Sequence, residues 1–233
     1  MPFRRTSVVR FHFGGYDAGT HTTSVRIRLG MDSLDPTALT DVAERVLAGL
    51  RNDSVTWAGL FNTGAKALYA AGTLIGSGTH VISLHLGSAV GEPAYAGTAF
   101  LMHKTNSFAI QELVREEADF RMAGTFQTAT VLYTQAVTTG TVTGTEVDYT
   151  STTTGTLTYY VHVFQLTTGT LNVLVESATT ATGAYTLHAS ANITAVTGTL
   201  LTATGSINRF VRHRHINTVA TGTQDVAAAA GKT

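Results

Sequence analysis

Threonine and glycine fill the second part of this chain, with almost no charge beside them. The last 98 residues hold 27 Thr, against 16 Thr in the first 135, and only eight Asp, Glu, Lys or Arg. The tripeptide Thr-Gly-Thr occurs twice in TTGTVTGT (138–145) and four more times after it. Branching at Cβ favours an extended Thr backbone, and Gly supplies the positive φ that tight turns need. The segment therefore predicts short strands joined by glycine turns, as in a β-sandwich or barrel.

The change in composition near residue 136 predicts two domains. We expect a first domain over residues 1–137, a linker over 138–145 and a Thr-rich β-sandwich over 146–233. The segments 167–170 and 197–206 are expected to be turns, and the first should close a hairpin. The expected strands of the sandwich are TLTYYVHVFQL (156–166), TLNVLVES (170–177), AYTLHASANIT (184–194) and INRFVRHRHINTV (207–219).

The first domain combines one helical pattern with several strand patterns. In DPTALTDVAERVLAGLR (35–51) apolar residues recur every three or four positions, and Asp41 with Glu44 resembles a capping box, so we expect an α-helix. Apolar and polar residues alternate in SVRIRL (24–29), HVISLHL (80–86) and SFAIQELV (107–114), which is typical of antiparallel strands with one polar face. The predicted fold class is mainly β: a β-sandwich or barrel domain with one α-helix, followed by a C-terminal β-sandwich domain.

Charge and cysteine content exclude several classes of protein. The chain has no cysteine, so disulfides and thiolate metal sites cannot form. Its formal net charge is zero, which argues against a nucleic-acid clamp. Charged residues make up 13% of the chain, about half the usual share, and such a surface suits a chain covered by its neighbours in an assembly. No apolar run reaches the roughly 20 residues of a membrane-spanning helix, and the N-terminus lacks a signal peptide's apolar stretch, so we expect synthesis in the cytoplasm and no membrane association.

Histidines offer one candidate metal site. In RHRH, His213 and His215 lie on one strand face and could begin a site that His188 joins across strands, although packed or surface histidines explain the pattern as well. No cofactor motif is complete, because GKT at the C-terminus has Val226 where a phosphate loop needs glycine. We therefore expect no cofactor and no bound metal.

The densest charge lies in QELVREEADFR (111–121). Its acidic residues are Glu112, Glu116, Glu117 and Asp119. They suggest three alternatives: a glycosidase pair, a solvated face with ion pairs, or an acidic wall facing something that must not bind. The acids cluster along one segment instead of coming from separate strands, so an enzyme is not expected.

Three longer stretches resemble the major tail tube proteins of long-tailed, non-contractile bacteriophages. Residues 31–62 (MDSLDP…AGLFN) end in a Gly-x-x-(Asp/Asn) turn at Gly59–Asn62, and residues 94–135 (AYAGTAF…LYTQ) are similar to a solvent-facing strand pair followed by a small-residue strand. Residues 156–216 resemble the C-terminal sandwich of such proteins, with VES and then an Arg-(Phe/Tyr)-(Leu/Val)-Arg strand at Arg209–Arg212. The chain departs from the family after VES, where SATTATGAY lacks the usual Ser-x-Asp-Gly turn and Trp, and Tyr185 takes the aromatic position.

The resemblance implies a structural role in the virion. Such proteins form hexameric rings that stack into a tail tube, and each copy gives strands to a closed inner β-barrel through which DNA passes without specific binding. It implies as partners other copies of the chain and the tape measure, tail terminator and distal tail proteins, with the sandwich on the outside of the tube.

Within that expectation, two groups of residues are candidates for sites. A lumen that conducts DNA should not hold phosphates, so the acidic residues Glu112, Glu116, Glu117 and Asp119 are the candidate lumen-facing residues. The N-terminal arm 1–19 and the glycine-rich loop with Gly72, Gly76 and Gly78 are the candidates for reaching the next ring. The alternative function is a carbohydrate-binding or adhesive β-sandwich, for which Tyr159, Tyr160 and Tyr185 would provide aromatic contacts.

Overall fold

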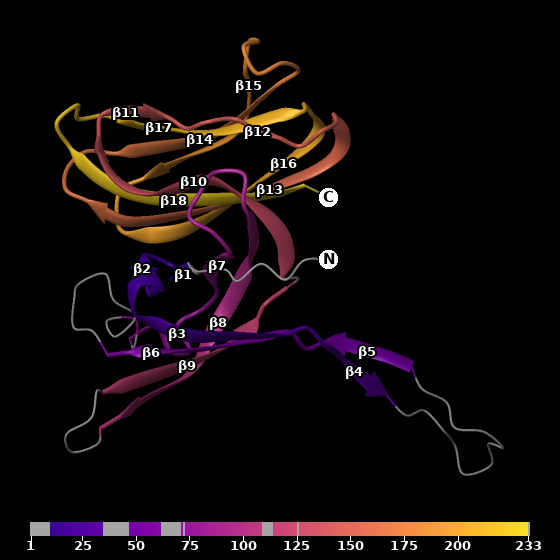
Figure 1. Ribbon diagram of the computed structural model, residues 1–233, viewed down its shortest axis with the longest axis vertical. Coiled ribbons are helices and arrows are strands. Elements are labelled where there is room, and N and C mark those ends of the chain that lie inside the picture. Colours follow the sequence, from indigo (N-terminus) through magenta and orange to yellow (C-terminus); the bar gives the residue numbers. More distant parts are fainter. Residues whose placement is uncertain are drawn as a thin grey trace.

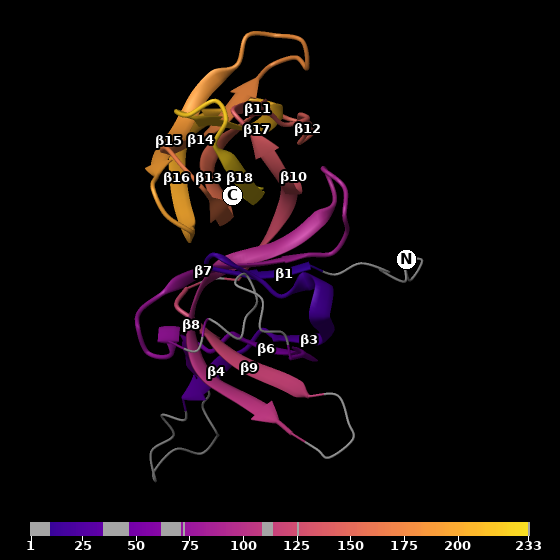
Figure 2. The same ribbon diagram turned by 90° about the vertical axis from the view of Figure 1, so that its left-hand side faces the viewer.

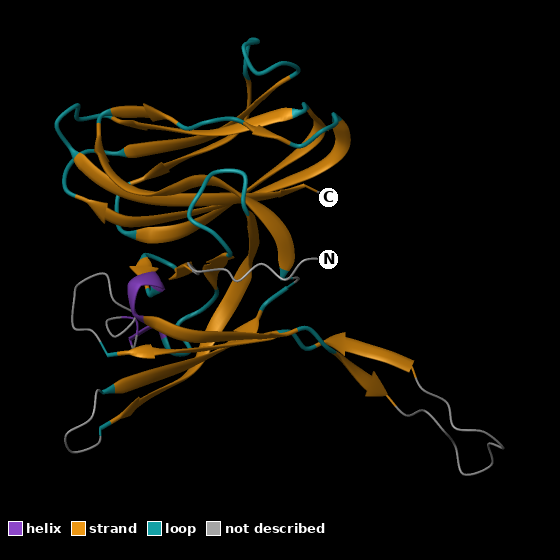
Figure 3. Cartoon of the chain, viewed as in Figure 1, coloured by secondary structure: helices purple, strands orange, loops and turns teal. Residues whose placement is uncertain are grey.

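The computed structural model describes residues 10–34, 47–61, 71, 73–108, 114–124 and 126–232. Almost all regular structure in these residues is β (Figure 3), apart from short 3-10 turns such as Gly19–His21. The strands are β1 (Arg10–Phe13), β2 (Tyr16–Asp17), β3 (Thr22–Arg28), β4 (Met31–Leu34), β5 (Leu47–Arg51), β6 (Ser54–Leu60), β7 (His80–His85), β8 (Pro93–Ser107), β9 (Arg115–Met122), β10 (Gln127–Thr139), β11 (Thr141–Thr143), β12 (Val147–Asp148), β13 (Thr153–Leu166), β14 (Leu171–Ala178), β15 (Thr186–Ile193), β16 (Thr197–Ile207), β17 (Phe210–Asn217) and β18 (Thr223–Lys232).

Two lobes lie one above the other (Figure 1). The N-terminal lobe, residues 10–126, packs its strands around a core of aromatic and aliphatic side chains. Trp57 is almost fully buried there and donates its Nε1–H to Thr22 Oγ1 at 2.8 Å, which satisfies the indole in an apolar setting. The ring of Phe11 lies beside those of Trp57 and Phe120. The hairpin of β4 and β5 extends away from the lobe to one side (Figure 1).

The second lobe, residues 127–232, is the predicted β-sandwich. One layer has the strand order β16-β13-β18-β10, and the other has β11-β17-β14-β15, with β12 also paired to β17. Figure 2 shows the two layers facing each other. Residues such as Leu157, Val175 and Val211 fill the space between them with no exposed surface. Alternation along the strands directs every second side chain into this core.

The boundary between the lobes differs from the predicted one at 137. β10 pairs with β8 over Gln127–Thr130 and with β18 over Thr130–Thr139, so it belongs to both lobes in one continuous sheet. Leu132 and Tyr133 already lie in the sandwich core. The predicted linker 138–145 is the end of β10, a turn at Gly140 with φ of 63°, and β11 paired with β17. A continuous ladder therefore takes the place of a separate connector.

The continuous sheet curls so that β1 and β7 face β13 across a third core, called here the junction. Strand β7 was predicted to have a polar solvent face, but Ser83 and His85 on that face are buried in the junction, while Ile82 and Leu84 face the N-terminal core. Strand β13 is also buried on both faces, because Tyr159 faces the sandwich core and Tyr160 faces the junction. Strands β1, β7, β13 and β18 are therefore buried on both faces, which period-two patterning alone does not reveal.

Four other expectations fail in the described residues. Leu47–Arg51, the end of the predicted helix, is strand β5, and the rest of that helix, 35–46, lies outside the described residues. Of the predicted strand 107–114, Ser107 is the last residue of β8, residues 108 and 114 carry no strand, and residues 109–113 lie outside the described residues. The expected turn 197–206 is part of β16, in unbroken register with β13. Segment 167–170 closes no hairpin, because β13 and β14 belong to opposite layers.

Candidate assembly surfaces

Four strands of the N-terminal lobe form a sheet in the order β8-β9-β6-β3. β9 pairs with Ala99–Ser107 of β8 on one side and with β6 on the other, and β6 pairs with β3. On its other edge β8 pairs with β7 only over its first half, up to Ala99. Just beyond this pairing, the Gly76 N–H donates a hydrogen bond to the Leu101 carbonyl at 3.4 Å. Among the described residues, no strand pairs with the outer edge of β3 or with that of β8 beyond Leu101. The sheet therefore has two open edges, which proteins normally protect or use.

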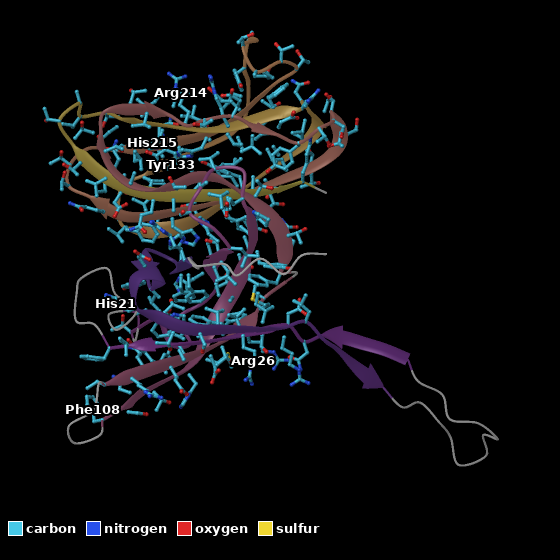
Figure 4. All side chains as sticks on the ribbon, in the orientation of Figure 1. His21, Arg26, Phe108, Tyr133, Arg214 and His215 are labelled. Atoms are coloured by element: carbon cyan, nitrogen blue, oxygen red, sulfur yellow. The ribbon has the colours of Figure 1, made fainter. Side chains whose placement is uncertain are left out.

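One face of this sheet packs on the N-terminal core and the other is exposed. Along β9 the pattern alternates without a break, with Ala118, Phe120 and Met122 buried and Arg115, Glu117, Asp119 and Arg121 exposed. Arg26 and Arg28 are exposed on β3, in register through β6 with Asp119 and Arg121. Figure 4 shows Arg26 pointing away from the sandwich. The exposed face thus carries both signs of charge, with arginine in excess among the described residues.

The four acidic residues proposed for one lumen-facing wall do not share a face. Glu117 and Asp119 lie on the exposed face described above. Glu116 points to the opposite side, is 1% exposed, and forms an ion pair with Lys104 Nζ at 2.5 Å. Glu112 lies outside the described residues. The correction follows from the strand geometry, because adjacent residues of a strand point to opposite faces.

Replacing Glu116 by Ala should lower the free energy of unfolding by about 3 kcal/mol, because it removes the carboxylate that lies 2.5 Å from the buried Lys104 ammonium. The matched change Glu117→Ala, one residue along on the exposed face, should change it by less than about 0.5 kcal/mol. Urea unfolding followed by the fluorescence of Trp57, the one tryptophan in the chain, measures both. Equal losses for the two variants would contradict this placement of the side chains.

The glycine-rich loop is folded against β8 in its described part. Gly76 and Gly78 have φ of 71° and 120°, and a Cβ at either position would meet nothing within 4 Å. Ser77 closes the turn by donating from its backbone N–H and its hydroxyl to the Leu74 carbonyl, at 3.1 and 2.8 Å. Gly72 lies outside the described residues. The loop lies beside the open edge of β8.

The predicted N-terminal arm, residues 1–19, is integral to the fold from residue 10 onward. β1 pairs with both β2 and β7, and Phe11 and Phe13 are fully buried. Residues 1–9 lie outside the described residues. The alternation of large aromatic residues in RFHF was the signal for a buried strand.

The aromatic residues of the adhesion alternative do not form a binding platform. Tyr159 is fully buried, and Tyr160 is 3% exposed and accepts a hydrogen bond from Gln127 Nε2 at 2.8 Å. Tyr185 is covered by the guanidinium of Arg212, whose Cζ lies 3.5 Å from the ring centroid. Tyr159 and Tyr160 are therefore core residues, and the face of the Tyr185 ring is covered by Arg212 of the same chain.

The histidines of RHRH are core residues as well. His213 and His215 share one strand face as predicted, and that face is the sandwich interior, where both are fully buried and join through Nε2 and Nδ1 at 2.7 Å. The Tyr159 hydroxyl contacts His213, and Figure 4 places Tyr133 and His215 between the two layers. His188 instead contacts the Ser177 hydroxyl at 2.6 Å. Across the described residues, no group of three or more His, Asp or Glu side chains is arranged to hold a metal ion.

A second histidine cluster, in the junction, was not expected from the sequence. His12, His85 and His162 come from β1, β7 and β13 and are buried together. Each lies between two apolar residues in a strand-like segment: FHF, LHL and VHV. That flanking pattern is the signal that could have marked them as buried.

In the part of the chain that the structure describes, no helix is long and apolar enough to cross a bilayer.

Comparison with known proteins gives neighbours by structure only. No family model matches the chain, and no curated protein does so either. The tail of an empty gene transfer agent particle, solved with C6 symmetry, is 14% identical with a TM-score of 0.42, over 55% of this chain and 98% of that one. The tail tube of phage SPP1 is 13% identical with a TM-score of 0.43, over 54% and 78%. The SPP1 protein Dit, described as a hub adsorption apparatus, is 9% identical with a TM-score of 0.34, over 97% and 100%. Of these three structures, two are thus described as a tail and a tail tube, and the third as a hub adsorption apparatus.

Proposed function

We propose that this chain is a non-enzymatic structural protein of a long-tailed phage virion, made in the host cytoplasm, whose copies join into hexameric rings that stack as the tail tube. The observation that carries the proposal is the sheet β8-β9-β6-β3, with one face on the core, one polar face exposed and both edges open. Closing such sheets into one barrel removes every edge. The sequence resemblance points to the same assembly.

The strand directions suit closure by repetition of one copy. β8, β9, β6 and β3 alternate in direction, because each neighbouring pair is antiparallel. β3 therefore runs opposite to β8, and β3 of one copy meets β8 of the next as another antiparallel pair. Met102, 53% exposed on β8, lies on the segment that such a joint would cover. A heterologous joint of this kind closes into a ring when the rotation per copy fits.

In the closed ring the exposed face becomes the lumen, and the sandwich lies outside. The face carries Glu117 and Asp119 among arginines, so its carboxylates offset part of the cationic charge next to passing DNA. This replaces the expectation of an acidic wall. DNA passes along the face without base-specific contacts. The hairpin β4–β5 extends from the sheet region, and the loop 73–78 lies beside the edge of β8. Both are the proposed contacts to neighbouring rings and to tape measure, terminator and distal tail proteins.

Changing both lumen carboxylates to lysine, Glu117→Lys with Asp119→Lys, should slow DNA ejection while tubes still assemble. The face would then hold only cations, and each added phosphate contact strengthens binding to DNA by counterion release. Ejection time courses at two salt concentrations measure the effect, which should shrink as salt rises. The control Glu117→Gln with Asp119→Gln should lie between the native protein and the lysine variant. Ejection at the native rate in low salt would contradict a lumen position for this face.

The joint itself is testable by disulfide formation, since the chain has no native cysteine. Ser24→Cys on β3 is combined in turn with Cys at Ser107, Thr105 or His103 on β8, because barrel strands tilt and the tilt offsets the register between copies. Within one copy β6 and β9 separate the two positions by about 14 Å, too far for a disulfide. Rings or tubes seen by negative-stain electron microscopy are oxidised and run on a denaturing gel.

One of these pairs should give a ladder of cross-linked copies that ends at six. The single variants give no ladder and serve as controls. A matched pair that combines Ser24→Cys on β3 with Thr202→Cys on β16 of the sandwich should also stay monomeric. Assembled tubes in which no β3–β8 pair cross-links would overturn the joint, and a protein that forms neither rings nor tubes at any concentration would overturn the proposed function.

A further inference from the structure

Three imidazoles meet in the junction between the two lobes. The ring centroid of His12 lies 4.7 Å from that of His85 and 5.3 Å from that of His162. None of the three side chains is more than 1% exposed. The Ser83 hydroxyl lies among them, at 2.8 Å from His162 Nε2, 3.4 Å from His85 Nε2 and 3.5 Å from His12 Nδ1. The cluster joins β1 and β7 of one lobe to β13 of the other.

The hydrogen bonds suit neutral rings. His162 Nδ1 donates to the Gly14 carbonyl at 2.8 Å, which leaves Nε2 to accept from the Ser83 hydroxyl. A proton added at Nε2 would reverse that bond, so that Nε2–H donates to Ser83 Oγ, and would place a charge on a fully buried ring. A second charge would lie about 5 Å from the first, where two cations repel strongly at low dielectric.

The charged groups around the cluster offer little compensation. On β1 Arg10 is a further cation, and on β2 the Asp17 carboxylate lies 3.7 Å from His12 Nε2. On β18 Asp225 accepts from Gln135 Nε2 of β10 at 3.2 Å, and on β7 the partly buried His80 contacts the Ser77 hydroxyl. On the side of the cluster away from these groups the surroundings are apolar, and the ring of Phe164 stacks on that of His162. A cavity of about 330 Å³ bordered by Arg10, Asp17, Gln135 and Asp225 brings solvent to this edge.

The lobes are joined in two different ways. β10 passes between them with register shifts at Val131/Tyr133 and Tyr133/Ala136, where a strand bends most easily. The junction is the second contact, and its apolar part is small, consisting mainly of alanine with Val81, Val131 and Tyr160. A Cβ on Gly198 of β16 would lie 2.9 Å from the Gly14 Cα, so the lobes meet backbone against backbone with no intervening side chain.

We propose that His12, His85 and His162 form an acid-sensitive latch, which holds the sandwich against the N-terminal lobe when neutral and lets it swing about β10 when protonated. The latch is independent of the proposed tail tube function. Burial lowers the pKa of His85 to about 3 and that of His162 to about 4, and burial with the two neighbouring imidazoles lowers the pKa of His12 well below its usual value. Exposed rings regain their ordinary pKa, so opening takes up protons and is favoured as the pH falls below about 6.5.

The test measures the distance between the lobes in the unassembled protein. Thr56→Cys on β6 and Thr202→Cys on β16 are both exposed and receive spin labels in a chain with no other cysteine. Pulsed electron paramagnetic resonance should give one distance at pH 7.5 and a growing second, longer distance between pH 6.5 and 5. Trp57 fluorescence and circular dichroism should keep their native values over that range, and a return to pH 7.5 should restore the single distance.

Two variants separate the latch from general acid damage. The triple change His12→Gln, His85→Gln and His162→Gln keeps polar groups in the junction but removes its titration, and it should hold the single distance down to pH 5. The control His213→Gln with His215→Gln alters the buried pair of the sandwich and should open like the native protein. If the triple variant does not fold, His162→Gln alone should shift the midpoint of opening to lower pH. Opening at the native pH in the folded junction variants, or a native distance that changes only when the circular dichroism signal is lost, would overturn the proposal.

Discussion

Acidification from pH 6.5 to 4.5 should lower the free energy of unfolding by at least about 5 kcal/mol. Burial lowers the pKa of His215 to about 4 and, with the neighbouring His215, that of His213 well below its ordinary value. At pH 7 both rings are neutral in the folded and the unfolded chain. As the pH falls below 6.5 only the unfolded chain takes up protons, so stability is lost by about 1.4 kcal/mol per ring and pH unit until the folded pKa is reached.

The junction histidines add to this loss for as long as the latch stays closed. Urea unfolding at pH 7.5, 6.5, 5.5 and 4.5, followed by Trp57 fluorescence, measures the dependence on pH. The variant His213→Gln with His215→Gln should reduce the slope by about 3 kcal/mol per pH unit, whereas His103→Gln, exposed on β8, should not change it. A native unfolding free energy that is flat between pH 6.5 and 4.5 would show that these rings are already protonated in the folded state.

Strands with alternating or β-branched residues could be predicted from the sequence. β3, β13, β14, β15 and β17 all overlap their expected segments. In these segments local pattern and tertiary structure agree, because one face of each strand is apolar and the residues favour extended backbone. The mainly β fold class was confirmed for the same reason.

Strands whose identity depends on their neighbours could not be predicted. β18 contains Ala227–Ala230, which favour helices in isolation, yet it lies between β13 and β10. Small side chains fit there because Tyr159 and Tyr160 of β13 occupy the space on the two faces. Only the fold supplies those neighbours. Similarly, Leu47–Arg51 fits a helical stripe and a strand equally well over five residues, and pairing with Met31–Leu34 decides between them.

The acidic residues grouped as one candidate site lie on two faces of β9, with Glu112 outside the described residues. Period two in REEADFRM places Glu116 with Ala118 and Phe120, and Glu117 with Asp119, so the sequence already held the division into two faces. Grouping the acids by charge alone obscured it. The open edges of β3 and β8, in contrast, depend on which strands pair with them. The residue pattern within either strand does not predict those pairings.

A proline that removes an N–H from the outer edge of β3 should raise the concentration needed for tube assembly more than about a hundredfold without unfolding the chain. Successive residues of a strand direct their N–H groups to opposite sides, so one of Val25→Pro and Arg26→Pro removes an N–H from the open edge and the other removes one from the ladder with β6. The edge variant should keep a melting temperature close to the native one. The ladder variant should lose about 3 kcal/mol of stability, which identifies it.

In the edge variant the free energy of each joint between copies becomes less favourable by the same amount, about 3 kcal/mol. The concentration needed for assembly should therefore be more than about a hundredfold higher than that of the native chain. Sedimentation and negative-stain electron microscopy over a concentration series measure this shift. The matched control is the pair Leu201→Pro and Thr202→Pro on β16, the open edge of the sandwich, whose folded member should assemble as the native chain does because that edge lies outside the proposed ring joint. Native assembly by the folded β3 variant, or equal inhibition by the folded β16 variant, would remove β3 from the joint and leave the barrel to be closed by some other edge.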